Sequence, residues 1–328
     1  MLTQSQAYSV AIAILSNGQG QAFVNKAIQL GLKGGFITPA KGMIESKILN
    51  QFGIHDRKRE VVIIPDERQT LLQKLPLLTK HFRMDQPNHG VIFLLHSNHD
   101  INQHHNLIDN DWKHLPVKHE LIMTTFRHER RIEMTQKLKE LGAHGGTLFT
   151  GRGQFNTEIQ KMLGIQFVPQ KDILLTVTPS EMVQNIFQSL DDYYHLTKTK
   201  GMRIHSFDVP LYSQDLETVQ LNHTEQLSSL SMLVSIISEN LKDSYLKFIH
   251  QQGSFGGTAL KAHGTLSESN NEKIFNMQIN PQKLILFTVD HSPVIHQTFQ
   301  KLILDENLNQ DHQSIFFTIP VHQAYGIS

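Results

Sequence analysis

Apolar runs of similar length recur along the chain at a nearly constant spacing, so self-similarity is the first feature to interpret. One set comprises Tyr8 to Leu15, His119 to Phe126 and Leu230 to Ile237, and each member starts 111 residues after the one before it. A second set is spaced by 112 residues and comprises 61–64, 173–176 and 285–288. We therefore predict three repeats, each long enough for one small domain.

Glycines mark equivalent positions in all three repeats. Glycine-rich segments lie at 31–35, 142–146 and 253–257, and single glycines at Gly42, Gly153 and Gly264. A spacing near 111 residues is the length of a domain, whereas solenoid repeats have periods of about 20 to 50 residues. The predicted domains, called repeats 1, 2 and 3 below, are 1–110, 111–225 and 226–328.

Repeat 2 predicts six elements in the order β-α-β-β-α-β. Ile132, Leu138 and Leu141 form the apolar stripe of a helix predicted over 129–141, which Gly142 ends by adopting a left-handed backbone. Pro179 opens a second helix, because proline is tolerated in a first turn. The predicted strands are 119–126, 145–150, 172–177 and 202–209. A polar stretch begins at Gly151, and a loop of this length is often functional.

This order is typical of the ferredoxin-like fold, an α+β architecture with two helices on one face of a four-stranded antiparallel sheet. Runs such as Val61 to Ile64 place apolar side chains on both faces of a strand, so the second face also needs cover. Three tandem domains arranged as a single-chain pseudotrimer supply that cover. The polar segments 99–118 and 213–229 are the predicted linkers, with Trp112 as a candidate interdomain anchor.

Composition narrows the classes of function. The chain has 30 basic and 30 acidic residues, which gives no basic surface for nucleic acid or for an anionic membrane. It has no Cys, so disulfides, thiolate zinc sites and cysteine nucleophiles are excluded. We find no run near the roughly 18 apolar residues of a membrane span and no charged start of a secretory signal. A soluble, cytoplasmic protein is expected.

The residues that open the long stretch of repeat 2 carry a family resemblance. They read Gly142-Ala-His-Gly-Gly-Thr-Leu-Phe-Thr-Gly-Arg-Gly-Gln154. Together with the three β-α-β-β-α-β repeats, this segment resembles the PII nitrogen-regulatory and PII-like signal-transduction proteins, which are homotrimers. The resemblance covers all three repeats and implies that one chain, as a monomer, takes the place of the trimer.

Members of that family bind adenine nucleotides between subunits, at the base of a T-loop and at a glycine-rich B-loop before the fourth strand. The resemblance implies an anion site made of backbone amides and cations. Its ligand-binding positions here are Thr147, Gly151, Arg152, Gly153, Gln154, Lys41, Gly42, His263 and Gly264, with Lys198, Lys200 and Gly201 at the B-loop of repeat 2. The segments 86–90 and 309–312 depart from the B-loop pattern, so we predict one competent cleft, around 151–154.

The resemblance also implies regulation of a partner protein, such as a transporter, an enzyme or another regulator. The T-loop-like segments 43–58, 154–170 and 265–281 are the expected contact loops. ATP, ADP, AMP and cyclic dinucleotides are the candidate effectors, and no obligatory cofactor is expected. These segments contain no Tyr, so control by uridylylation of a loop tyrosine is not expected.

Two other interpretations stay open. The divergent B-loops favour a ligand-free interaction scaffold, and the related trimeric CutA proteins offer a metal-binding alternative. The His-rich segment 96–105 lies in a predicted linker and lacks a compact spacing such as HExxH, so we predict no metal site. No carboxylate pair, Ser-x-x-Lys or His-Asp combination recurs in step with the repeats, and no Walker A sequence occurs, so we expect no enzyme.

Overall fold

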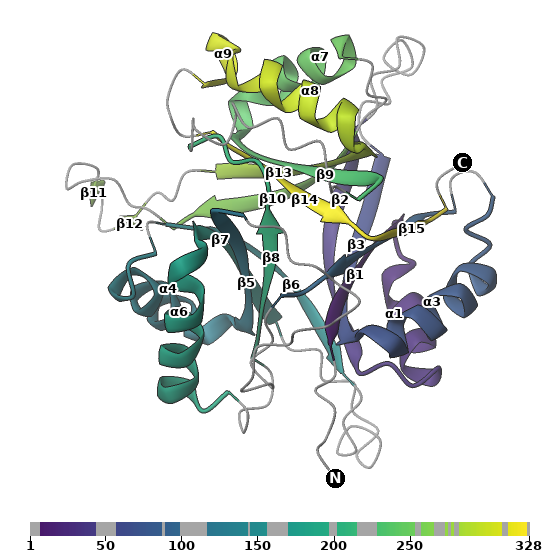
Figure 1. Ribbon diagram of the computed structural model, residues 1–328. Helices are drawn as coiled ribbons and strands as arrows, with labels where there is room; N and C mark the ends of the chain where they lie inside the picture. Colours follow the sequence, from purple (N-terminus) through teal and green to yellow (C-terminus); the bar gives the residue numbers. More distant parts are fainter. Residues whose placement is uncertain are drawn as a thin grey trace.

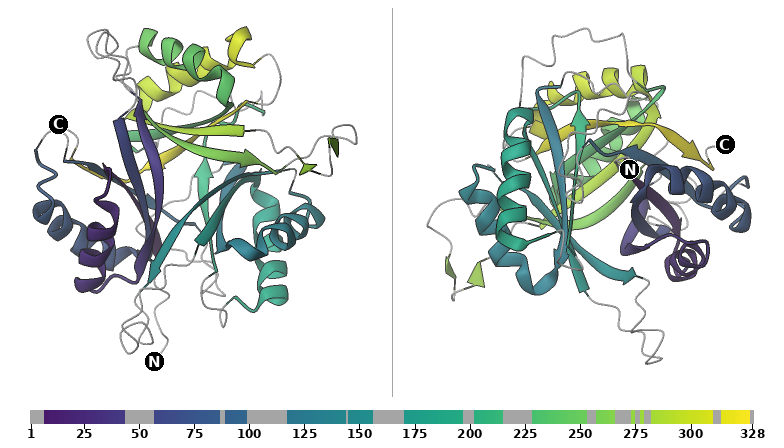
Figure 2. Two further views of the ribbon diagram at one scale, coloured as in Figure 1. Left: turned by 180° about the vertical axis from the view of Figure 1, so that it is seen from behind. Right: turned by 60° about the horizontal axis from the view of Figure 1, so that its bottom comes forward.

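The computed structural model has the predicted α+β class, with a large antiparallel sheet inside and helices outside (Figure 1). The sheet contains 13 strands among the described residues, and the helices lie outside it in three groups, one for each repeat (Figure 2). The structure describes residues 7–43, 57–86, 89–98, 117–143, 145–155, 170–196, 202–214, 228–252, 257–265, 273–274, 277–278, 282–309 and 314–326.

Repeat 1 forms a four-stranded part of this sheet with two helices. Its elements are β1 (Tyr8–Ser16), α1 (Gly20–Gln29), β2 (Gly34–Met43), β3 (Arg57–Glu67), α3 (Arg68–His81) and β4 (Val91–His96). The strands lie in the order β2-β3-β1-β4, and each neighbour is antiparallel. Helix α1 stops before Gly31, whose φ of +100° is a backbone conformation that glycine adopts without steric cost.

Repeat 2 has the same element order and the same strand order, β6-β7-β5-β8. Its elements are β5 (His119–Arg127), a 3-10 turn (His128–Arg130), α4 (Arg131–Glu140), β6 (Thr147–Phe155), β7 (Gln170–Pro179), α6 (Ser180–Tyr194) and β8 (Arg203–Val209). The predicted helices and three of the four strands are confirmed to within a few residues.

Two details of the prediction for repeat 2 were wrong. Strand β6 continues to Phe155, so 151–154 belongs to a strand and does not open a loop. Ile132 is 73% exposed, whereas Met134 and Leu138 are buried. Ile132 and Leu138 both lie in α4, and six residues at about 100° per residue place Ile132 about 120° around the helix from Leu138, away from the buried face.

Repeat 3 again gives the order β10-β13-β9-β14. Its elements are β9 (Leu230–Ser238), a 3-10 turn (Glu239–Leu241), α7 (Lys242–Gln251), β10 (Gly257–Gly264), β13 (Gln282–His291), α8 (Ser292–Ile303), α9 (Glu306–Asn309), β14 (Ile315–Val321) and β15 (Gln323–Tyr325). Strands β11 (Lys273–Ile274) and β12 (Met277–Gln278) pair antiparallel in a separate two-stranded sheet.

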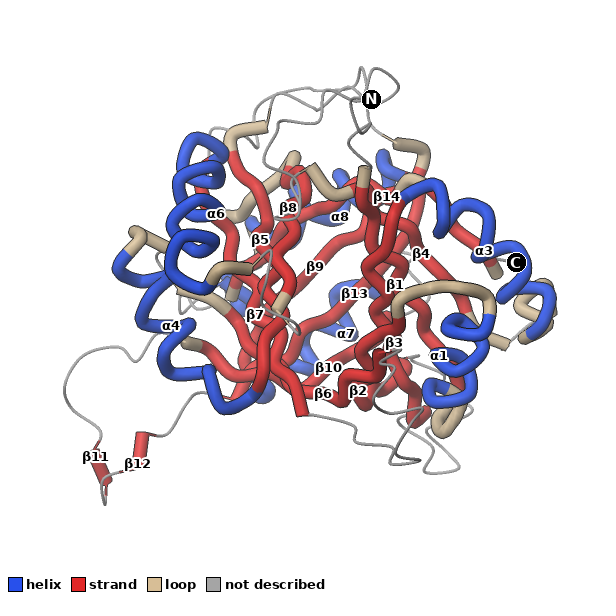
Figure 3. Tube along the Cα trace, turned by 90° about the horizontal axis from the view of Figure 1, so that it is seen from below, coloured by secondary structure: helices blue, strands red, loops and turns tan. Residues whose placement is uncertain are grey.

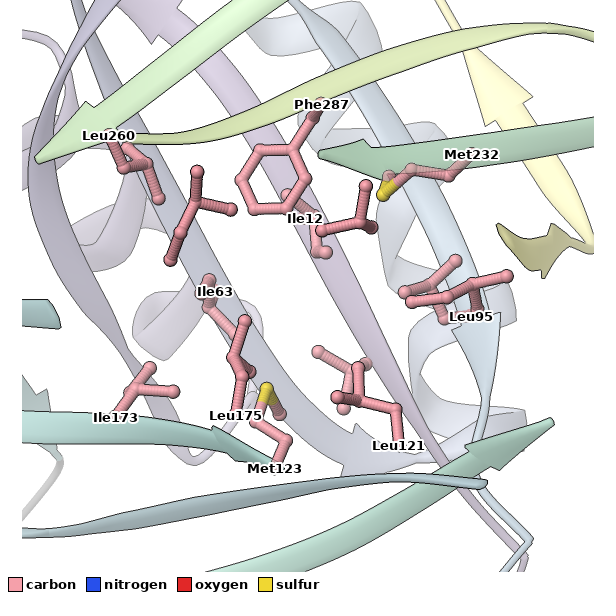
Figure 4. Packing of buried hydrophobic residues seen from close by; sticks show 14 of the residues in the cluster. Ile12, Ile63, Leu95, Leu121, Met123, Ile173, Leu175, Met232, Leu260 and Phe287 are labelled. Atoms are coloured by element: carbon pink, nitrogen blue, oxygen red, sulfur yellow. The ribbon is translucent and has the colours of Figure 1, made fainter. Parts of the chain in front are cut away.

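Both faces of the strands are buried. On the outer face, the helix pairs cover apolar clusters centred on residues such as Phe23, Ile186 and Phe299. On the inner face, side chains of all three repeats meet in one central cluster (Figure 4). Alternation along a strand separates the two sets: Ile173 and Leu175 point inward, and Leu174 between them points toward the helices.

The chain also links the repeats through the ends of their fourth strands. The backbone amide of Asn98 donates to the Ser206 carbonyl, that of Ser213 to the Phe316 carbonyl, and that of His322 to the Leu94 carbonyl. Each fourth strand is thus extended onto the fourth strand of the next repeat, and β15 returns to β4 of repeat 1. In Figure 3, β4, β8 and β14 lie toward one end of the molecule and β2, β6 and β10 toward the other.

Among the described residues, no helix combines the length and apolar character that crossing a bilayer requires.

Candidate functional site

The second strands of the three repeats pair with one another in a closed ring, called here the second-strand ring. Strand β2 pairs with β6, β6 with β10, and β10 with β2. The start of each strand runs antiparallel to the end of another, which defines junctions 1/2, 2/3 and 3/1. The register is the same at all three: Phe36 lies opposite Gly153, Thr147 opposite Gly264, and Thr258 opposite Gly42.

This ring accounts for several of the residues that the sequence singles out. Thr147, Gly42, Gly153 and Gly264 take part directly in its inter-repeat pairing. Gly151 has a packing reason as well, because a Cβ there would lie 2.4 Å from the backbone oxygen of Ile37 and 2.5 Å from Cζ of Phe36. The equivalent positions of the other repeats hold alanine, opposite smaller neighbours. The recurrent glycines therefore serve the ring whether or not a ligand binds.

At junction 1/2, Arg152 reaches a carboxylate of repeat 1. Its Nη2 lies 3.7 Å from Oε1 of Glu60, and the Arg152 side chain is 57% exposed. The other carboxylate oxygen, Oε2, accepts a hydrogen bond of 2.7 Å from the backbone amide of Gly20, the first residue of α1. A carboxylate is favoured at that helix start, because the helix dipole places partial positive charge there. Arg152 thus extends a pairing that Glu60 already makes with the helix.

At junction 2/3, the equivalent carboxylate is Asp172, which is fully buried. Arg131 donates from Nε to Oδ2 at 2.7 Å and from Nη2 to Oδ1 at 3.1 Å. Thr150 donates its hydroxyl to Oδ1 at 2.7 Å, and Nδ1 of His128 lies 3.1 Å from the same oxygen. These four side chains come from four elements and form one connected polar network.

The charge on Asp172 is held by its neighbours. Burial by itself raises the pKa of this carboxyl, but the hydrogen bonds from Arg131, Thr150 and His128 outweigh it and keep the pKa below its usual value. Arg131 and His128 are about one-third exposed, so they form the accessible side of the network.

Exposed His263 occupies the β10 position equivalent to Arg152.

Junction 3/1 has no carboxylate at the equivalent position, which is occupied by buried Leu284. Lys261 lies with Nζ 3.4 Å from Oε1 of Glu239 in the turn before α7. Lys242 begins that helix, and Asp243 follows it. Lys41 lies opposite Ala259, diagonally from Lys261, a spacing of about 7 to 8 Å across strands. Among the described residues named at this junction, lysines outnumber carboxylates by three to two.

The remaining predicted residues are placed as follows. Gln154 lies opposite Gly35 in the ring. Lys198, Lys200 and Gly201 lie outside the described residues, as do Trp112 and most of the segments 43–58, 154–170 and 265–281. Of the His-rich segment, His96 is described and stacks on His322 with ring centroids 3.9 Å apart, at the fourth-strand end of the molecule.

Sequence reasoning missed the network around Asp172. The residues are scattered at 128, 131, 150 and 172, and no spacing rule joins a turn, a helix start and two strands. One signal was present: Asp172 is a charged residue at the start of an otherwise apolar strand, and buried charges in folded proteins are normally paired.

Comparisons with known proteins give no family for this chain. No family model matches it, and no curated protein matches it. Among solved structures, it is matched with a Fusobacterium nucleatum protein described as "Putative monooxygenase", at 9% identity and a TM-score of 0.20. That match covers 64% of this chain and 95% of the other. A likeness at that TM-score carries no argument about fold or function.

Proposed function

We propose that the chain is a single-chain counterpart of a PII-like trimer: three ferredoxin-like domains around a pseudo-threefold axis, with regulatory and not catalytic activity. An anionic effector, an adenine nucleotide, binds at a junction between repeats and changes how the chain contacts a partner protein. The observation that carries this proposal is the second-strand ring, whose three junctions share one register and bring equivalent positions of neighbouring repeats together.

A junction between repeats is suited to signalling because the ligand contacts two domains at once. If the effector prefers one arrangement of the neighbouring loops, binding shifts the population toward it, and the partner senses that shift by linkage. The segments 43–58, 154–170 and 265–281 follow the second strands directly, so they are the loops proposed to report the ligand. This coupling requires no catalysis.

Charge distinguishes the three junctions as anion sites. At junctions 1/2 and 2/3, the cations Arg152 and Arg131 lie beside the carboxylates of Glu60 and Asp172. Junction 3/1 has Leu284 in place of a carboxylate. The proposal therefore places the strongest phosphate binding at Lys41, Lys242 and Lys261, with the junction of Arg152 as the weaker alternative.

A thermal-shift panel with ATP, ADP, AMP and cyclic dinucleotides tests this assignment. A ligand at 100 times its Kd adds about 2.7 kcal/mol to the free energy of unfolding, which is readily measured. Lys41→Gln and Lys261→Gln should remove the nucleotide response, and Arg152→Gln should leave most of it. Lys247→Gln, which removes a charge from an exposed site further along α7, is the matched control and should respond like the unmodified chain.

Loss of the response in Arg152→Gln alone would instead place the site at junction 1/2. A second function, a ligand-free scaffold, is favoured by the internal ion pairs that cations make at all three junctions. It predicts no stabilisation by any nucleotide, in the unmodified chain or in any variant. The CutA-like alternative predicts a melting temperature that falls after dialysis against EDTA and recovers with a divalent metal.

A further inference from the structure

Three basic side chains occupy neighbouring positions at one end of the repeat 2 strands. Arg127 in β5 lies directly opposite Lys171 in β7. On the other side of β5, Arg203 in β8 lies opposite Thr125, two residues from Arg127. The three residues thus span three adjacent strands, within the reach of long side chains.

All three side chains belong to the inner face of the sheet. Lys171 has the same strand parity as Ile173 and Leu175, which lie in the central cluster. Arg127 shares the parity of Leu121 and Met123, and Arg203 that of Phe207, all of which are also in the central cluster. At the inner-facing positions of β5, β6, β7 and β8 that the structure describes, no residue is acidic.

The other repeats show that the fold does not require this arrangement. Their third strands keep a cation, Arg59 or Lys283, but the residue opposite is a serine. Nη1 of Arg59 donates to the Ser16 hydroxyl at 3.1 Å, and Nζ of Lys283 donates to the Ser238 hydroxyl at 3.3 Å. The positions equivalent to Arg203 are Val91 and Ile315. Repeat 2 alone therefore adds two arginines around the shared cation.

The electrostatics of Lys171 agree with this geometry. Its side chain is 3% exposed, whereas Arg127 is exposed and Arg203 is half-buried. Burial first, and then the charges of Arg203 and Arg127, lower the pKa of Lys171 to about 8. An anion among these groups would favour the charged form of the lysine and accept hydrogen bonds from two planar guanidinium groups.

We propose that Arg127, Lys171 and Arg203 form a binding site for a small oxyanion, a phosphate or a phosphate monoester. Arg127 is the accessible edge of this site and Lys171 its buried end. The site differs from the junctions of the second-strand ring, because Lys171 faces inward whereas its neighbour Asp172 faces the helices. The proposed oxyanion site and the proposed nucleotide site can therefore be tested independently.

Thermal unfolding in inorganic phosphate tests the proposal, with sodium chloride at the same ionic strength as the reference. Parallel arms with sulfate and with glycerol phosphate separate a general oxyanion site from one that accepts a monoester. We expect phosphate to raise the melting temperature of the unmodified chain above the chloride reference. The double variant Arg127→Ser with Arg203→Val imports the residues of repeat 1 and should lose that rise.

Lys283→Met is the matched control, because Lys283 is a buried lysine at the equivalent position of repeat 3. It should keep the phosphate response. An equal response in the unmodified chain and the double variant, or no response beyond chloride, overturns the proposal.

A titration of the Lys171 side chain by NMR covers the case in which the double variant does not fold. In the unmodified chain, phosphate should move the pKa of Lys171 upward from about 8. A value that is the same in phosphate and in chloride also overturns the proposal.

Discussion

Repeats 2 and 3 form the same sheet from different chemistry. At equivalent positions, repeat 2 has a charged residue where repeat 3 has a neutral one: Glu120 and Ser231, Arg127 and Ser238, Asp172 and Leu284, Arg203 and Ile315, Asp208 and Pro320. Both repeats nevertheless have the same element order and strand order. The backbone therefore does not depend on these charges.

The difference shows that the two repeats stabilise equivalent positions in different ways. Removing a charge from water is costly, and a well-packed apolar residue often stabilises a site as well as an ion pair does. Leu284 fills its position by burial alone, whereas Asp172 needs three polar neighbours. Repeat 2 therefore keeps its buried charge only while the polar partners are present. Substituting any of these residues should affect repeat 2 and have no counterpart in repeat 3.

The largest effect is expected for Asp172→Ala. The substitution leaves Arg131 and Thr150 without the carboxylate they share, so we expect a loss of about 3 to 4 kcal/mol in the free energy of unfolding, measured by urea denaturation. Because the pKa of Asp172 is lowered in the fold, its contribution is present above about pH 4 and is lost as the pH falls below that value.

A double variant with the residues of repeat 3 tests whether this loss comes from breaking the ion pair. Asp172→Leu combined with Arg131→Lys installs the residues found at Leu284 and Lys242. This double variant should cost clearly less than Asp172→Ala, because it replaces the pair instead of breaking it. Equal losses in the two variants would mean that the repeats are not interchangeable at this position.

The next effect concerns pH and the link from repeat 3 back to repeat 1. Burial, His322 and Arg68 lower the pKa of His96 to about 2, and burial and Arg68 lower that of His322 to about 3. Both stay neutral in the fold, while the unfolded chain takes up protons below about pH 6.5. Stability should therefore be nearly complete above pH 7 and fall by about 3 kcal/mol by pH 5.5.

Denaturation curves collected across this pH range check that expectation. His322→Asn, which imports the residue found at the equivalent Asn98, should roughly halve the pH dependence. His250→Gln alters an exposed histidine and should leave the dependence unchanged. A slope unaffected by His322→Asn would show that other histidines cause it.

A smaller effect is expected at the link from repeat 1 to repeat 2. Nδ2 of Asn98 donates to Oε2 of Glu120 and to Oδ1 of Asp208, and both carboxylates are buried. Asn98→Ala removes both bonds and should lower the free energy of unfolding by about 2 kcal/mol. Asn98→Asp brings a third carboxylate to the same place and should lower it further. If the aspartate variant is the more stable of the two, the hydrogen bonds from Asn98 to the two carboxylates do not stabilise the link between repeats 1 and 2.

The smallest effect is expected at Gly151. An alanine there presses on the backbone oxygen of Ile37 and on the ring of Phe36, and we expect a cost of about 1 to 2 kcal/mol. Shortening the side chain with Phe36→Leu should remove the part of this cost that comes from the ring and leave the part that comes from the Ile37 backbone oxygen. A double-mutant cycle measures this coupling, and strictly additive losses would show that the two residues do not constrain each other.

Local patterns of the chain predict its local structure well and its long-range contacts poorly. The apolar run 119–126 predicted strand β5, and the helical segment that ends at Gly142 predicted helix α4. The extension of β6 through Gly151 to Gln154 was missed because these residues look like a polar loop. They are ordered by hydrogen bonds to β2, a strand more than a hundred residues away, and no local pattern encodes that pairing.

The candidate site shows the same division. Gly42, Gly153 and Gly264 were found through their recurrence and Thr147 through the family resemblance, and all four lie at the inter-repeat pairing. Asp172 and its partners do not recur, because each repeat fills that position differently. A search for recurring residues therefore cannot find the residues that distinguish one junction from another, because these residues differ between the repeats.

The return of β15 to β4 has a consequence for synthesis. Residues 323–325 cover the edge of a strand that ends at His96, so more than two hundred residues are translated between the two. At about 5 to 20 residues per second, the edge of β4 waits about ten to forty-five seconds for its cover. During that interval, an exposed strand edge is open to pairing with other nascent chains.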